Sequence, residues 1–95
     1  MLLTGDSTYD YNEHPVLSAD GSKVVFDCSP VPYGQEGTAI CEVNTNGSGF
    51  RVVAQPTDMG GTMDNALHHP DYAPDGSIVF ESDWGGEKIW WLLWV

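Results

Sequence analysis

The sequence predicts an all-β fold in which one antiparallel meander occurs twice. Residues 14–22 read HPVLSADGS, and 55 residues later residues 69–77 read HPDYAPDGS. Each copy is followed by a triplet of β-branched and aromatic residues, 24–26 and 78–80, which favours a strand. Eleven glycines and six prolines interrupt the chain every few residues, and no segment carries an apolar stripe at helical spacing.

The first copy contains four expected strands. Asp20-Gly21 marks a tight turn between the first two strands, and residues 44–49 mark the turn before the last one. We therefore expect strands near 15–19, 23–28, 38–44 and 50–54.

The second copy contains one expected strand fewer. Asp75-Gly76 marks the equivalent turn, and strands are expected near 71–73, 77–82 and 87–95. Residues 1–4 and 51–54 each precede a polar loop that ends in His-Pro. Residues 1–4 are therefore expected to form the last strand of such a unit, without its first three.

The repeat resembles the TolB-type β-propeller family, which is WD-like. Its motif of a proline, a Pro-Asp-Gly turn and a strand is matched from Pro15 to Phe26, with Ala19 in place of the usual proline, and from Pro70 to Phe80. Ile89-Trp90 and Leu3-Thr4 match the next two strands of that family. The resemblance implies two four-stranded antiparallel β-propeller blades within residues 1–95. Residues 14–54 would be blade 1, and residues 69–95 would be blade 2 without its outer strand.

The length of 95 residues bears on assembly. Propellers close with about 4–8 blades, so two blades cannot close a ring. We expect head-to-tail homo-oligomers of about three to five chains, in which residues 1–4 complete a blade of the next chain. A fragment of a longer propeller is the alternative. The expected interface consists of Met1, Leu2, Leu3, Ile89, Trp90, Trp91, Leu92, Leu93 and Trp94.

Charge and hydropathy exclude several classes of partner. Three Lys and Arg stand against 14 Asp and Glu, and this net charge of −11 argues against a nucleic-acid partner. The longest apolar run, 89–95, is far shorter than the ~20 residues of a membrane-spanning helix, so no membrane partner is expected. The N-terminal residues 1–6 have no basic region and no long apolar stretch, so no signal peptide is visible, although the resemblance implies a periplasmic or extracellular protein.

The candidate site residues are histidines and carboxylates that are expected on the long-loop face of the meanders. His14, His68 and His69 could hold a divalent cation, or they could only fix the loop backbone. A weaker resemblance of the stretch from His68 to Asp83 to oligogalacturonate lyase blades implies a histidine-bound metal. Candidate ligand-binding carboxylates on the same face, which could also be merely solvated, are Asp6, Asp10, Glu13, Asp58 and Asp64.

Cys28 and Cys41 are either disulfide-bonded or two buried thiols. If Phe26 pairs with Val43, as Phe80 would with Leu92, the two cysteines face each other across neighbouring strands. The cross-strand spacing of ~4.5–5.5 Å permits a disulfide.

Two functions are compatible with these patterns. The first is a non-enzymatic propeller scaffold that binds a ligand of unknown identity, because the sequence has no Gly-x-Ser-x-Gly nucleophile motif and no phosphate-loop lysine. No catalytic residue is assigned. The second is a metal-dependent, carbohydrate-active propeller of the oligogalacturonate lyase type, or a piece of one.

Overall fold

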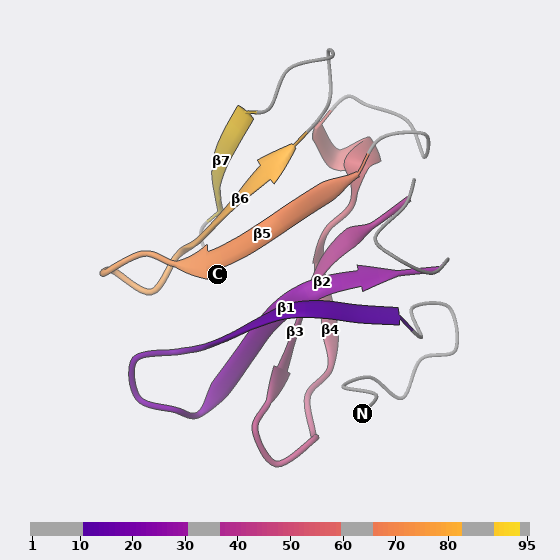
Figure 1. Cartoon of the computed structure of the whole chain (residues 1–95). Helices are drawn as coiled ribbons and strands as arrows, with labels where there is room; N and C mark the ends of the chain where they lie inside the picture. Colours follow the sequence, from indigo (N-terminus) through magenta and orange to yellow (C-terminus); the bar gives the residue numbers. More distant parts are fainter. Residues whose placement is uncertain (1–10, 31–36, 60–65, 83–88, 94–95) are drawn as a thin grey trace.

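The computed structural model describes residues 11–30, 37–59, 66–82 and 89–93, and these residues form an antiparallel β-structure (Figure 1). In these ranges no helix is long and apolar enough to cross a membrane. The expected all-β fold is confirmed. The elements are β1 Tyr11–Leu17, β2 Lys23–Ser29, β3 Ala39–Asn44, β4 Arg51–Ala54, the 3-10 turn η3 Pro56–Met59, β5 Leu67–Tyr72, β6 Ile78–Ser82 and β7 Ile89–Leu93.

The strands form two meanders, as the repeat predicts. The first sheet has the order β1-β2-β3-β4, and the second has the order β5-β6-β7. Neighbouring strands are antiparallel throughout, and each strand pairs with the next one in the chain. The second sheet therefore repeats the first three strands of the first sheet.

The Asp-Gly turns join the first two strands of each sheet. Gly21 and Gly76 have φ angles of 75° and 89°, in the left-handed region that glycine adopts without a steric penalty. Their amides donate to the carbonyls of Ser18 and Ala73, both at 2.9 Å. The loops are longer than the two-residue turns that the sequence suggested, because each turn begins at the residue before the Ala-Asp or Pro-Asp pair.

The first strand of each sheet begins four residues earlier than expected. β1 starts at Tyr11 where residue 15 was expected, and β5 starts at Leu67 where residue 71 was expected. The pairing register shifts between Glu13 and Val16 and between His68 and Asp71. A His-Pro pair suggests the end of a strand because proline lacks the N–H that strand pairing needs. Here the pair forms a β-bulge, and strand pairing continues on both sides of it.

The expected strand registers were wrong. Phe26 pairs with Cys41 and not with Val43, and Phe80 pairs with Trp91 and not with Leu92. The register of a hairpin is set by the geometry of its connecting loop, and a strand pattern does not contain that information.

Cys28 and Cys41 nevertheless form a disulfide, with 5.9 Å between their Cα atoms. Cys28 pairs directly with Ala39, so the bond runs diagonally between β2 and β3. A register shift of two residues keeps side chains on the same face, and this is why both sulfurs still meet.

Apolar side chains cover both faces of the first sheet. On one face, a buried cluster contains the two disulfide-bonded cysteines together with Phe26, Ala39 and Val43. On the other face, Val25 and Ile40 pack against residues of the second sheet. That cluster is completed by Ala54, Leu67, Ile78 and Phe80. The alternation of Val25 and Phe26 follows from the two-residue period of a strand, and it places the second sheet against one face only.

Candidate functional site

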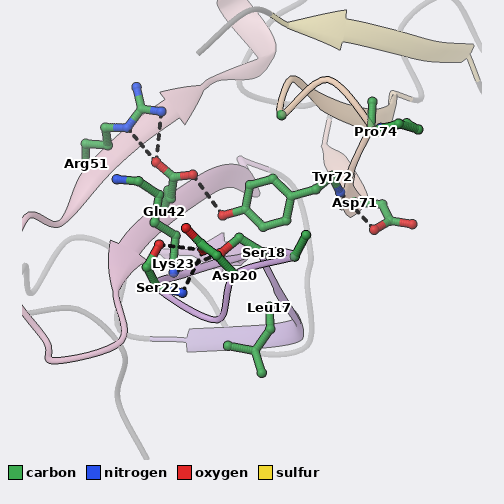
Figure 2. Close-up of a pocket in the computed structure, with 13 residues that line it drawn as sticks. Leu17, Ser18, Asp20, Ser22, Lys23, Glu42, Arg51, Asp71, Tyr72 and Pro74 are labelled. Carbon is green, nitrogen blue, oxygen red and sulfur yellow. Dashed lines mark hydrogen bonds and ion pairs between the residues drawn. The ribbon is translucent and has the colours of Figure 1, made fainter.

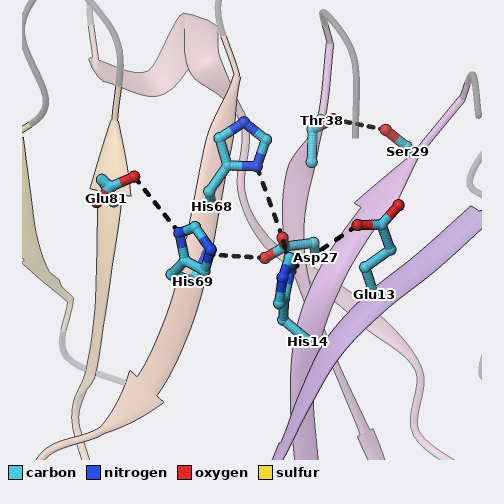
Figure 3. Close-up of polar contacts among 8 residues, drawn as sticks. All are labelled: Glu13, His14, Asp27, Ser29, Thr38, His68, His69 and Glu81. Atoms are coloured by element: carbon cyan, nitrogen blue, oxygen red, sulfur yellow. Dashed lines mark hydrogen bonds and ion pairs between the residues drawn. The ribbon is translucent and has the colours of Figure 1, made fainter. Parts of the chain in front are cut away.

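A buried carboxylate on β2 connects the histidines of both sheets (Figure 3). Asp27 is only 2% exposed. Its Oδ2 lies 2.8 Å from Nδ1 of His14 on β1 and 3.6 Å from Nδ1 of His68 on β5. Its Oδ1 accepts a hydrogen bond of 3.0 Å from the backbone N–H of His69. Asp27 therefore joins the first strands of both sheets at one point.

His14 and His69 occupy equivalent, strained positions. Both have a φ angle of 53°, and they are the non-glycine residues with positive φ among the described residues. Such a conformation costs about 1 kcal/mol or more, and it persists where the surrounding contacts stabilise it. The two rings lie 4.5 Å apart, and Nδ1 of His69 lies 3.4 Å from Oε1 of Glu81. The bulge turns both imidazoles toward the junction of the sheets.

This geometry brings His14, His68 and His69 close to one another, although they were expected in loops. They lie inside β1 and β5, at the bulges. In the described part of the chain, no three His, Cys, Asp or Glu side chains form a group that could hold a metal ion. The Nδ1 atoms of the three histidines face the carboxylates of Asp27 and Glu81, so a bound divalent metal stays a prediction.

Elemental analysis of protein purified without a metal-affinity column tests that prediction. The expected result for a metal protein is one divalent ion per chain that is lost in His69→Ala. A matched variant outside the cluster, Asp71→Ala, keeps the ion. A metal-free wild-type protein that shows no uptake in an added-metal titration contradicts the prediction.

Of the other predicted site residues that the structure describes, Glu13 lies beside a histidine and Asp58 lies in a separate 3-10 turn. Glu13 lies on β1, with its Oε2 3.9 Å from Nδ1 of His14. Asp58 lies in η3, where Oδ2 accepts a hydrogen bond of 2.8 Å from the backbone N–H of Gln55. Ile89 to Leu93 form β7. The predicted residues outside the described ranges are Met1, Leu2, Leu3, Asp6, Asp10, Asp64 and Trp94.

A cavity of about 740 Å³ lies at the opposite end of β1 and β5, and the sequence analysis did not anticipate it (Figure 2). Its walls are the two Asp-Gly turn segments, with β3 and β4 contributing Glu42 and Arg51. Leu17 and Tyr72 occupy the same position in the two copies of the repeat, and both line this cavity. The sequence signal for this cavity was the equivalence of Leu17 and Tyr72, because equivalent strand ends of two packed sheets can lie near one another.

A hydrogen-bonded network across the two sheets forms one side of the cavity. Oε1 of the buried Glu42 accepts from Nε and Nη2 of Arg51, at 3.0 and 2.9 Å. The Tyr72 hydroxyl donates to Oε2 of Glu42 at 2.8 Å. Burial, with the Glu42 carboxylate as the second cause, raises the pKa of Tyr72 well above its ordinary value. The phenol therefore remains a donor at neutral pH.

Tyr72→Phe tests the strength of this contact between the sheets. We expect the free energy of unfolding to fall by about 1 kcal/mol, because Glu42 loses one donor while it stays buried. Chemical denaturation of both proteins at neutral pH measures the difference. Tyr11→Phe is the matched control, since Tyr11 is exposed; equal losses in the two variants would contradict the role of the Glu42 contact.

Asp20 is a second polar group of the cavity. The Ser22 hydroxyl, the Ser22 backbone N–H and the Ser18 hydroxyl lower the pKa of Asp20 to about 2. Their donor atoms lie 2.7, 3.0 and 2.8 Å from Oδ1. Asp20 is therefore a fixed negative charge at neutral pH.

Ser22→Ala is expected to move the pKa of Asp20 upward, toward its ordinary value of 3.8, because the largest stabilising hydrogen bond is lost. The native state favours the ionised form, so this contribution to stability is present above pH 3.8 and is lost as the pH falls through about 2. Carboxyl-carbon NMR titration measures the shift. Ser77→Ala, which removes the equivalent bond to Asp75, should leave Asp20 unchanged.

Comparisons with known proteins give no relative for this chain. No protein-family model, no curated protein and no solved structure matches it.

Proposed function

We propose that this chain is a non-enzymatic binding scaffold of the β-propeller type, which assembles with copies of itself. The proposal rests on one difference between the two sheets: the first has four strands, whereas the second has three described strands. In the first sheet β3 pairs with β4, whereas no described strand pairs with the outer edge of β7. A fourth strand from a second copy would make the two sheets equivalent.

Strand addition suits this edge for two physical reasons. An open edge presents unpaired backbone donors and acceptors, which a further strand satisfies. Residues 1–4 read MLLT and stand before a polar loop and a His-Pro pair, as β4 does. Because the second sheet already packs on the first through Val25, Ile40 and Phe80, the same mode of packing can be repeated between chains.

The mass of the protein in solution tests self-assembly. We expect native mass spectrometry and light scattering to give a closed oligomer of about three to five chains. Removal of residues 1–4 should convert it to smaller species, and a double substitution of Leu2 and Leu3 by aspartate should do the same. Leu17→Asp is the control, because Leu17 is 60% exposed and should tolerate the charge. A wild-type monomer at all concentrations would overturn the proposal.

A further inference from the structure

The geometry points to the cavity between the two Asp-Gly turns as a binding site for a small aliphatic amine in its ammonium form. This inference goes beyond the proposed scaffold function. It does not depend on assembly, since every residue of the cavity comes from one chain.

The size and the walls of the cavity favour a small molecule with an apolar stem. A volume of about 740 Å³ lies within the range of ligand pockets, about 300–1,000 Å³. Leu17, which is 60% exposed, lines it together with Ala19, Ala73 and Pro74. An exposed leucine in a hollow with such neighbours gains from contact with an alkyl chain.

The carboxylates of the two turns supply the charge. Asp20 lies on one turn segment, and Asp71 lies at the end of β5 beside the other. Both side chains accept hydrogen bonds on Oδ1: Asp20 accepts from Ser18 and Ser22, and Asp71 accepts from the backbone N–H of Tyr72 at 2.8 Å. These bonds hold the carboxylates in place, and each Oδ2 can accept from an ammonium group.

The cations of the cavity are engaged within the protein. Arg51 uses Nε and Nη2 on the carboxylate of Glu42, and Nζ of Lys23 donates to Oδ1 of Asn44 at 3.2 Å. Three carboxylates and two cations line the cavity, and the chain as a whole has a net charge of −11. This balance opposes an anion and attracts a cation from a distance.

Tyr72 adds an aromatic surface at a fixed position. Its hydroxyl is held by Glu42, and Asp20 is close enough to the phenol to contribute to its raised pKa. An ammonium group near an aromatic face is attracted by the ring quadrupole. Carboxylate, aromatic ring and apolar wall together match an alkylammonium ion better than a neutral alcohol of the same length.

NMR titration of the full chain with three probes of equal chain length tests the inference. We expect n-pentylamine to shift the backbone amides of Leu17, Asp20 and Ala73, and to bind at least about tenfold more tightly than pentan-1-ol or pentanoate. Added salt should weaken the binding of the amine. Equal or tighter binding of pentanoate or pentan-1-ol, or no binding of the amine, would overturn the inference.

A pair of equivalent aspartates gives a matched control. Asp20→Asn should weaken n-pentylamine binding about tenfold. Asp75→Asn removes the same charge from the equivalent turn, where Asp75 bonds to Ser77 as Asp20 bonds to Ser22, but Asp75 does not line the cavity. The Asp75→Asn variant should therefore bind n-pentylamine with the affinity of the wild-type protein. Equal weakening in both variants would show a general charge effect and would overturn the site.

Discussion

Joint replacement of Cys28 and Cys41 by alanine is expected to lower the free energy of unfolding by about 3 kcal/mol. The disulfide closes a loop between residues 13 positions apart. A crosslink of this loop length lowers the conformational entropy of the unfolded chain and so stabilises the native state by about that amount. Both cysteines are fully buried in the cluster of Phe26, Ala39 and Val43. A chain of 95 residues has a small core, so this is a large share of its stability. Denaturant unfolding of the two proteins measures the loss.

Reductant separates the crosslink from the change in packing. Reduced wild-type protein should unfold at a lower denaturant concentration than oxidised protein, whereas the double alanine variant should not respond to reductant. Intact mass before and after reduction reports the state of the bond. Unchanged stability of fully reduced wild-type protein would contradict a stabilising role for the disulfide.

The second large effect is expected at Asp27. Asp27→Ala should lower the free energy of unfolding by about 2–3 kcal/mol, because the backbone N–H of His69 loses its acceptor and His14 loses its carboxylate partner. The carboxylate bridges the two sheets, so the loss should also loosen their contact. Hydrogen exchange of the β5 amides measures that local effect, and denaturant unfolding measures the global one.

Two further variants isolate the contribution of the bridge. Asp27→Asn keeps an acceptor for the His69 amide and should retain part of the stability. Asp71→Ala removes an exposed carboxylate from the same strand that carries His69 and should have little effect on stability. If Asp27→Ala and Asp71→Ala were equally stable, the bridge would have no role in holding the sheets together.

The secondary structure could be predicted to a large extent because its signals are local. The triplets 24–26 and 78–80 lie in β2 and β6, and the Asp-Gly pairs lie in the turns before them. The starts of β1 and β5 could not be predicted in the same way. A proline lacks the N–H that a ladder needs, and strands tolerate it at sheet edges and bulges. β1 and β5 are edge strands with a register shift at the His-Pro pair, where His14 and His69 adopt the left-handed conformation.

Strand register required information that no single strand contains. The disulfide illustrates this point: the sequence allowed Cys28 and Cys41 to meet, but the bond is diagonal and not directly cross-strand. Both registers place the cysteines on one face, so the expectation survived an error of two residues. An error of one residue, as at Phe80, exchanges the faces of a strand.

The candidate sites also combine features that local sequence patterns predict with features that only the packing of the two sheets decides. The sequence by itself determined the repeat, the antiparallel meanders and the equivalence of His14 with His69, since these depend on short-range patterns. Only the tertiary structure decided that Asp27 receives the histidines of both sheets, and that a cavity opens between the two turns. Those features depend on how one sheet packs on the other, and this packing is fixed by contacts between residues distant in the chain, such as Val25, Ile40 and Phe80.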